Sequence, residues 1–177
     1  AYDPENPSQH IIDMSENEIE VPEDYTREEL RQDLLCYTSP VLKEDLVLTG
    51  DMTAELYISS DAPDTDFVVR VTDVDENGRS IKLADGLLSA RYRNGFAQSE
   101  FLQEGEIVCL KIRTTKLSNC FRKGHRIRVT VTSSAKNFIF PNSNTREGFA
   151  SARTVVAHNR VYHGGLHASR LTVRVEP

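Results

Sequence analysis

The stretch FRKGHRIRVTVTSS, residues 121–134, decides the fold class of this chain. A charged turn with one glycine leads into a segment in which apolar and polar residues alternate. The apolar residues are Ile127, Val129 and Val131, and the polar residues are Arg126, Arg128 and Thr130. A period of two is typical of a strand in an antiparallel sheet, with one face toward the core and one toward water. The stretch therefore predicts a half-buried strand.

The same alternation recurs along most of the chain after residue 34. Turn residues such as Pro63-Asp64 and Asn77-Gly78 separate the alternating segments. The expected strands are residues 52–58, 67–72, 87–93, 106–114, 126–133, 153–156 and 169–175. With about eight short strands and no long helix, the sequence predicts an all-β fold, a jelly-roll β-sandwich of the galactose-binding-like type.

Residues 1–33 differ in composition from the rest. Two prolines in AYDPENPSQH indicate an extended, irregular segment. Thr26, with Glu29 three residues later, has the spacing of a capping box and predicts one helical turn. We therefore expect an interdomain linker over residues 1–33 and a β-sandwich domain over residues 34–177.

Composition excludes several classes of protein. A net charge of -6 and a pI of about 5.4 argue against nucleic-acid binding, which needs clustered Lys and Arg. No apolar run approaches the roughly 18 residues of a membrane span. The three cysteines form no Cys-x-x-Cys pair, which argues against a disulfide framework or a zinc site. Because the acidic N-terminus also lacks the pattern of a signal peptide, we expect a cytoplasmic protein.

One segment resembles the start of a calcium-binding EF-hand loop. Residues 73–78, DVDENG, place oxygen ligands at positions one, three and five and glycine at position six. The glutamate required at position twelve is replaced by Ala84, and the flanking residues alternate as in strands. Asn77-Gly78 suits a tight hairpin turn with positive φ. A hairpin is therefore the favoured prediction.

Two other groups contain residue types that bind metals. Asp61, Asp64 and Asp66 could hold a hard cation, although aspartates at this spacing more often cap turns through backbone amides. The other group is His158, His163 and His167, which lack the helical spacing of a zinc protease and have no cysteine nearby. We expect no metal and no cofactor.

Catalytic nucleophile motifs are absent. The chain contains no Gly-x-Ser-x-Gly pentapeptide, which an α/β-hydrolase needs for its nucleophile. Residues 133–136, SSAK, match Ser-x-x-Lys, but they follow a strand instead of beginning a helix. His163-Gly164-Gly165 is similar to an oxyanion-hole tripeptide, which has no use without a nucleophile. The sequence therefore predicts no catalytic residue in this chain.

Several segments in order resemble one known family. The most specific match is Ser59–Phe67 followed by Asp73–Asp75. The other segments are Tyr2–Pro4, Asp33–Ser39, Val47–Gly50, Ala84–Leu88, Arg91–Arg93 and Gly124–Arg128. Together with the 121–134 stretch, they are similar to the C-terminal β-sandwich domain of the X-Pro dipeptidyl-peptidase and cocaine-esterase family of serine hydrolases. The sequence departs from the family pattern at Ser89, at Ala168 and at Val173–Val175.

The resemblance implies a non-catalytic domain of a larger serine hydrolase. In such a parent, Ser, His and Asp outside this chain cleave an ester or amide. The domain would pack on the α/β-hydrolase catalytic domain and shape its substrate pocket or an oligomer interface. Whether the parent acts on X-Pro peptides, esters or acyl amides stays open at this point.

One segment is the candidate for contact with that catalytic domain. In residues 136–145, two phenylalanines stand among asparagines, a mixture typical of apolar anchors within a polar rim. The candidate contact residues are Phe138, Phe140, Asn142 and Asn144. In the alternative interpretation, Phe138 and Phe140 fill the end of the sandwich core.

A second function class is a free-standing carbohydrate-binding jelly-roll module. Sugar platforms usually use exposed aromatic rings, above all Trp. This chain has no Trp, and aromatic residues make up only 7% of it. A self-contained enzyme, the third class, would need a nucleophile or metal group that the sequence does not contain.

Overall fold

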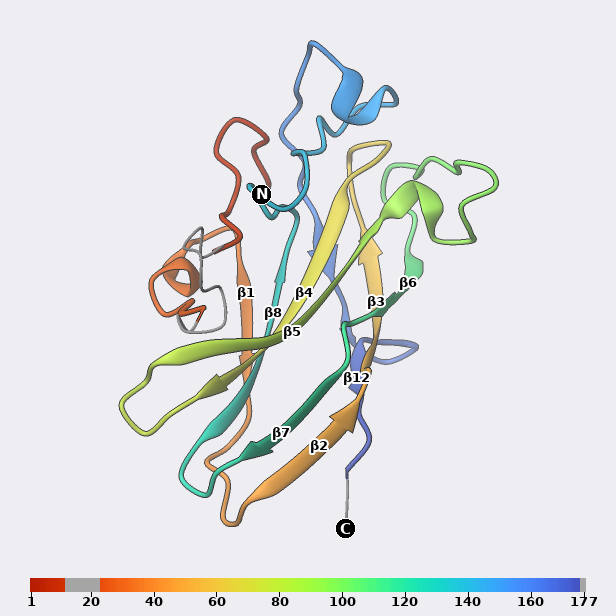
Figure 1. Ribbon diagram of the computed structural model, residues 1–177. Helices are drawn as coiled ribbons and strands as arrows, with labels where there is room; N and C mark the ends of the chain where they lie inside the picture. Colours follow the sequence, from red (N-terminus) through yellow and green to blue (C-terminus); the bar gives the residue numbers. More distant parts are fainter. Residues whose placement is uncertain (12–22, 176–177) are drawn as a thin grey trace.

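The computed structural model describes residues 1–11 and 23–175, which form an antiparallel β-sandwich of two layers (Figure 1). The first layer has the strand order β1-β8-β4-β5. Its strands are β1 (Leu35–Thr38), β8 (Arg126–Thr132), β4 (Asp66–Val74) and β5 (Ser80–Ser89). The described part contains three short 3₁₀ helices and no α-helix. The all-β sandwich is confirmed, and the finer jelly-roll type stays a prediction.

The second layer has the strand order β12-β3-β6, with β9 also pairing with β3. The pair β2-β7 continues this layer toward the lower end in Figure 1. The strands are β2 (Leu46–Gly50), β3 (Thr53–Ser59), β6 (Val108–Arg113), β7 (Leu117–Phe121), β9 (Arg160–Val161) and β12 (Arg170–Thr172). A separate short hairpin joins β10 (His163–Gly164) to β11 (His167–Ala168).

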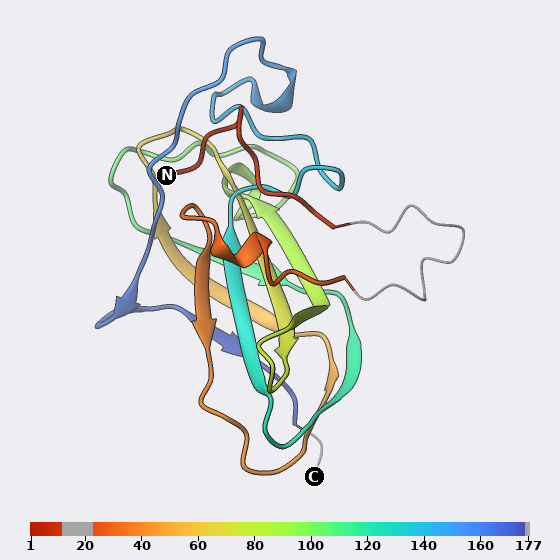
Figure 2. The same ribbon diagram turned by 90° about the vertical axis from the view of Figure 1, so that its left-hand side faces the viewer.

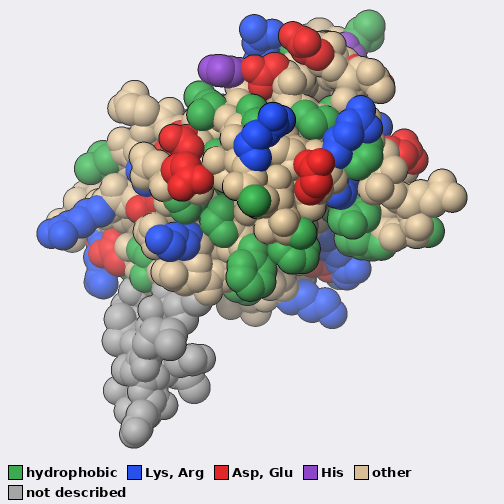
Figure 3. All heavy atoms as spheres, turned by 90° about the horizontal axis from the view of Figure 1, so that it is seen from above, with side chains coloured by type: hydrophobic (Ala, Val, Ile, Leu, Met, Phe, Trp, Pro, Cys, Tyr) green, Lys and Arg blue, Asp and Glu red, His purple; other side chains and the backbone are tan. Residues whose placement is uncertain are grey.

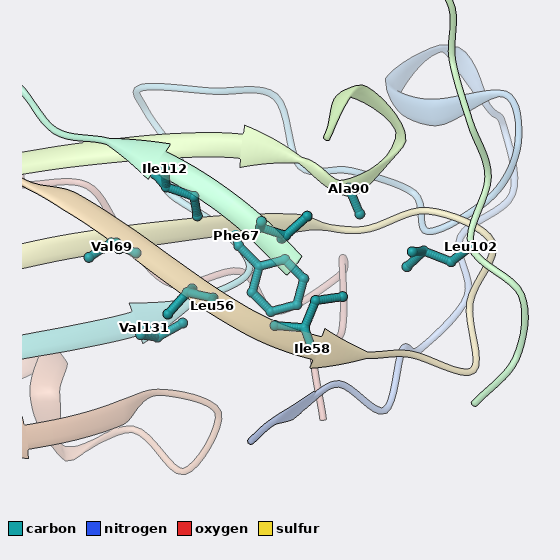
Figure 4. Packing of buried hydrophobic residues seen from close by; sticks show 10 residues of the cluster. Leu56, Ile58, Phe67, Val69, Ala90, Leu102, Ile112 and Val131 are labelled. Carbon is teal, nitrogen blue, oxygen red and sulfur yellow. The ribbon is translucent and has the colours of Figure 1, made fainter. Parts of the chain in front are cut away.

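The core lies between the two layers, where the apolar faces of the alternating strands meet (Figure 4). Phe67 and Val69 of β4 face Leu56 and Ile58 of β3, and all four side chains are buried. Burying side chains of this size stabilises the fold by about 1.5–3 kcal/mol each. The apolar positions of the alternating segments thus form the inner face of each layer.

The outer face of the first layer is also buried over β4 and the second half of β8, which the sequence pattern did not predict. Residues 1–11 and 23–33, with the 3₁₀ helix η1 (Glu28–Leu30), lie across this face (Figure 2). The polar side chains beneath them are Arg70, Thr72, Thr130 and Thr132, and none is more than 3% exposed. The predicted wet face of the 126–133 strand is therefore wrong over its second half, because the N-terminal segment excludes water there.

Three strand predictions need correction, and one strand was missed. Residues 153–156 form no strand, because Val155 N donates to Ser143 O in an irregular segment. The 87–93 strand ends at Ser89, where the 3₁₀ helix η2 (Ala90–Tyr92) begins. Only β12 forms within residues 169–175, and β7 was not predicted, because its sequence LSNCF contains little alternation.

The helical turn predicted near Thr26 forms as η1, but the capping box does not. The N-cap residue of η1 is Arg27, and it makes no side-chain cap hydrogen bond. Thr26 Oγ1 instead donates to Asp24 Oδ1 and accepts a hydrogen bond from Ser80 N. The capping prediction failed because tertiary partners outcompete the local ones. Among the described residues, no helix has both the length and the apolarity needed to cross a membrane.

Candidate docking site

The chain between β8 and β9, residues 133–159, forms a long loop at the end of the sandwich where the N-terminus also lies (Figure 1). It contains one short 3₁₀ helix, η3 (Gly148–Ala150). Asn137 and Asn144 adopt left-handed backbone conformations, with φ of 81° and 62°, which asparagine tolerates better than most residues. The loop carries all four predicted contact residues.

The N-terminal segment holds both ends of this loop. Near Ala1, the backbones of Tyr2 and Ala157 exchange two hydrogen bonds of 2.8 and 2.9 Å. At the other end of the loop, His10 N donates to Lys136 O, and Lys136 N donates to Ser8 O. The position of the loop therefore depends on the first ten residues.

Asn142 and Asn144 lie inside the molecule, 5% and 0% exposed. Asn142 Nδ2 donates to the carboxylates of Asp64 (2.7 Å) and Asp66 (2.9 Å), and Asn142 Oδ1 accepts from Asn144 N. Asn144 Nδ2 donates to Val155 O. The two asparagines therefore do not form the exposed polar rim that the sequence suggested. The Asn142 amide connects the loop to Asp64 and to Asp66, the first residue of β4, and the Asn144 amide bonds within the loop.

Arg91 fixes the second half of the loop. Its Nε donates to Asp64 Oδ2 (2.7 Å) and its backbone N to Asp64 Oδ1 (3.0 Å). The guanidinium also donates to the carbonyls of Thr145 and Arg146. Gly148 has a φ of 64°, and a Cβ there would lie 3.2 Å from the guanidinium, which makes glycine the fitting residue. Asp64 is fully buried, so breaking the pair would cost about 3–5 kcal/mol.

One aspartate of this network, Asp66, has a raised pKa. Burial raises the pKa of the Asp66 carboxyl, and the negative charge of Asp64 raises it further. The hydrogen bond from Asn142 works in the opposite direction. This compact polar network of Asp64, Asp66, Arg91 and Asn142 makes the end of the sandwich a rigid platform for the loop.

Three aromatic rings stand out from this platform, and we call Phe138, Phe140 and Phe149 the aromatic patch. They are 54%, 78% and 74% exposed. The rings of Phe140 and Phe149 stack with centroids 5.8 Å apart, and Phe138 stacks on His10 at 4.6 Å. The exposures rule out the alternative in which Phe138 and Phe140 fill the core. Phe149 was missed, because a single phenylalanine in a loop carries no sequence signal.

Hollows and charges border the aromatic patch. One hollow of about 340 Å³ lies along residues 136–141, and one of about 330 Å³ lies between residues 61–63 and the second half of the loop. Seen from above, hydrophobic side chains at this end lie between basic and acidic ones (Figure 3). Exposed Arg146, Glu147 and Arg153 belong to this loop. Apolar anchors with a charged surround have the anatomy of a protein interface.

The family profile described as X-Pro dipeptidyl-peptidase C-terminal non-catalytic domain matches residues 2–172. The chain belongs to this family. The family resemblance read from the sequence is confirmed, and the description agrees with the absence of nucleophile motifs.

Relatives of known sequence and structure support the assignment. Cocaine esterase of Rhodococcus is 37% identical over 150 residues, which cover 82% of this chain and 26% of that protein. An aminopeptidase of a Thaumarchaeota archaeon superimposes with a TM-score of 0.90 over 99% of this chain and 32% of its own, at 24% identity. An alpha-amino acid ester hydrolase superimposes with a TM-score of 0.87 over 98% of this chain and 31% of its own, at 23% identity. The two structures support the fold alone, and the chain spans about a quarter of the esterase.

The EF-hand-like segment is the turn of the β4–β5 hairpin in this family domain. Asp75 Oδ1 accepts a hydrogen bond from Asn77 N, and Gly78 has a φ of 85°. Ala84 lies within β5, where a calcium loop would need its glutamate. The hairpin prediction is confirmed.

The other two groups of metal-binding residue types do not assemble as complete sets, although Asp64 and Asp66 lie close together at Asn142. Asp61 binds His158 through its Nδ1 (2.7 Å) and lies apart from the network around Asp64. His163 Nε2 is hydrogen-bonded to Tyr37 OH (2.8 Å). Within residues 1–11 and 23–175, no three His, Cys, Asp or Glu side chains gather in a way that could hold a metal ion. Neither group forms a cation site in this part of the chain.

The Ser-x-x-Lys match is not a catalytic pair. Ser133 is buried at the end of β8, and its hydroxyl accepts a hydrogen bond from Asn159. The side chain of Lys136 is exposed in the loop. His163-Gly164, of the oxyanion-like tripeptide, forms β10 of the short hairpin. Among the described residues, Ser133 and Lys136 therefore do not form a serine–lysine pair.

Proposed function

We propose that this chain packs on the α/β-hydrolase catalytic domain of its parent serine hydrolase through the end that carries the aromatic patch. Its role there is to shape the substrate pocket. The observation that carries the proposal is the exposure of Phe138, Phe140 and Phe149 on a loop that a buried polar network holds rigid. Loops on rigid scaffolds are the usual sites of contact and function.

The position of the N-terminus also supports docking through the end of the sandwich that carries the aromatic patch. The family domain is C-terminal, so the catalytic part of a parent protein would precede this domain in the chain. Tyr2 lies beside Ala157 at the base of the loop. We accordingly propose that residues 1–33 are the interdomain segment and that residues 34–177 are the sandwich domain.

The energetics favour coverage of the patch. Each phenylalanine taken out of water contributes about 1.5–3 kcal/mol, so the patch could supply much of the stability of an interdomain contact. The exposed charges of Arg146, Glu147 and Arg153 would lie at the rim, where they fix the orientation more than they add affinity.

The experiment compares the intact parent hydrolase with its Phe138→Ala/Phe140→Ala variant. We expect a lower melting temperature of the whole protein and a higher KM for a short-chain nitrophenyl ester. The matched control is Leu166→Ala, because Leu166 is 90% exposed on the β10–β11 hairpin, outside the loop. Unchanged melting and unchanged kinetics in the phenylalanine variant would refute the docking proposal.

A second measurement tests the non-catalytic role. The isolated chain should not hydrolyse the nitrophenyl ester, and the parent should hydrolyse it and lose activity with a serine-directed reagent. Hydrolysis by the isolated chain would overturn the proposal and return attention to Ser133 and Lys136.

The same end could serve an oligomer of the parent. Sedimentation of the phenylalanine variant separates the two uses: a change of oligomeric state with unchanged KM would assign the patch to a subunit interface.

The carbohydrate-binding alternative has no observation in its favour, and calorimetric titration with galactose and short oligosaccharides tests it.

The three cysteines are free, and on this basis we place the parent in a reducing, cytoplasmic compartment.

A further inference from the structure

A pocket of about 250 Å³ opens between the two layers of the sandwich, away from the aromatic patch. It lies where β1 and β8 face β3 and β12. Its walls are mostly apolar and come from Ala54, Leu56, Val129, Val131, Val161 and Leu171. Three of these residues, Ala54, Leu56 and Val131, belong to the main hydrophobic core and are at most 6% exposed. The pocket is therefore an indentation of the core itself.

The size of the pocket is unusual for a packed interior. Protein cores contain few voids larger than a water molecule. An enclosed apolar cavity of about 150 Å³ stays dry and binds benzene. This pocket is open to solvent on one side, and its 250 Å³ has room for a molecule of about ten non-hydrogen atoms. Water has few polar partners on these walls, whereas an apolar ligand would replace missing packing contacts.

Polar groups line the mouth of the pocket. Tyr37 OH and His163 Nε2 are joined by a hydrogen bond of 2.8 Å that connects β1 with the β10–β11 hairpin. Ser169 lies beside them and accepts a hydrogen bond from Tyr57 N. These groups can bond the single polar end of a ligand whose body lies among the valines and leucines.

The charge at the mouth is balanced. Arg170 also lines the pocket, but its guanidinium is paired with the carboxylate of Glu55. An anionic ligand would have to compete with Glu55 for this guanidinium. A neutral polar end, such as an alcohol or an ester carbonyl, avoids that competition.

We propose that this pocket binds a small neutral molecule with one aromatic ring or branched alkyl group and one hydroxyl or carbonyl end. The ring lies between Leu56 and Val129, and the polar end lies at Tyr37 and Ser169. The Tyr37–His163 hydrogen bond borders the mouth, which is open to solvent. The inference does not depend on the docking proposal, because the two sites share no residue.

The test uses 3-phenylpropan-1-ol as a probe and the full chain with ¹³C-labelled methyl groups. We expect saturable shifts of the methyl signals of Val129, Val131, Val161 and Leu171, with one molecule bound per chain. The melting temperature should rise with probe concentration, because a ligand that binds only the folded state stabilises it. 3-Phenylpropanoate, the anionic analogue, should bind at least several-fold more weakly.

Two filling variants make the test specific. Ala54→Leu puts three further carbon atoms into the pocket and should weaken binding at least tenfold. Val161→Leu adds a carbon atom from β9, in the same layer as Ala54, and should weaken binding as well. This second variant keeps the test decisive if Ala54→Leu does not fold. Leu166→Ala, on the exposed turn of the hairpin, is the matched control and should bind as the wild type does.

The overturning results are equally definite. Methyl signals of the pocket that do not move at saturating probe would refute the proposal. Shifts confined to residues around Phe140 and Phe149 would place the binding at the aromatic patch instead. Filling variants that fold and bind the probe as tightly as the wild type would also refute it.

Discussion

The two faces of β4 are both shielded from water, but by opposite means. On the inner face of β4, Phe67, Val69 and Val71 pack into apolar clusters. On the outer face of the same strand, Arg70 and Thr72 lie at 0% exposure beneath the N-terminal segment. The inner face is stabilised by packing, whereas the outer face uses hydrogen bonds to the segment that covers it. Arg70 is bonded only in part: its Nη2 donates to Gln9 O, its guanidinium lies over the Tyr25 ring, and Nε and Nη1 have no hydrogen-bond partner among the described residues.

Glu29 shows how the outer face is satisfied. Its carboxylate accepts hydrogen bonds from Ser80, Thr72 and Arg128. A buried polar group costs little when it is bonded and a great deal when it is not. The comparison teaches that a strand with one polar face can be buried on both sides, provided that another segment brings matching partners.

The largest effect should come from the inner face. Phe67→Ala removes a ring that is 1% exposed and leaves a cavity, so the free energy of unfolding should fall by about 3–5 kcal/mol. Guanidinium unfolding of the full chain measures it. Phe96→Ala, at a ring 79% exposed, is the control and should change stability by less than about 0.5 kcal/mol. Equal losses in the two variants would contradict the placement of the core.

The next effect should come from the outer face. Glu29→Ala leaves Ser80 and Arg128 without their acceptor, and we expect a loss of about 2–3 kcal/mol. Glu29→Gln keeps an oxygen for Ser80 and should lose less. A loss below about 0.5 kcal/mol for Glu29→Ala would mean that the polar layer contributes little to stability.

His10 gives the outer face a pH dependence. The imidazole is 6% exposed; burial lowers its pKa, and the positive charge of Lys82 lowers it further. Above about pH 6.5 both the folded and the unfolded chain hold a neutral imidazole, so it makes no difference to stability. Below that pH the unfolded chain takes up the proton more readily than the folded chain, so the free energy of unfolding falls as the pH falls.

The measurement is denaturant unfolding of the wild type and His10→Gln from about pH 7 down to about pH 5. The difference in stability between the two proteins should change over this range, with the wild type losing more. Parallel curves would contradict a depressed pKa of His10 in the folded chain.

The smallest effect should come from a single hydroxyl of the polar layer. Thr132 Oγ1 lies 3.3 Å from Ser8 Oγ, and Thr132→Val should cost about 0.5–1.5 kcal/mol, measured by thermal unfolding. Thr172→Val replaces an exposed strand residue of β12 and should be close to neutral. If the two variants have the same melting temperature, the contact between Ser8 and Thr132 does not contribute to stability.

Much of the fold could be predicted, since inner-face residues such as Val69, Val129 and Val131 alternate strictly along their strands. The burial of Arg70 and Thr130 could not, because the strand sequence carries no information about a distant segment that covers it. The same limit explains the capping error at Thr26, where Ser80 supplies a partner from far along the chain.

The candidate site was predictable only in part. Phe138 and Phe140 were marked by their polar neighbours, and they are exposed. Asparagines in a loop are usually solvated, so no local pattern distinguishes Asn142, which bonds two buried aspartates. Phe149 joins the patch only through tertiary stacking on Phe140.

The backbone bonds of Tyr2 to Ala157 and of Ser8 and His10 to Lys136 have a mechanical consequence. These hydrogen bonds connect the first ten residues to both ends of the loop that carries the aromatic patch. A pull or twist on the chain at Ala1 would therefore load these two attachment points in shear before it reaches the core.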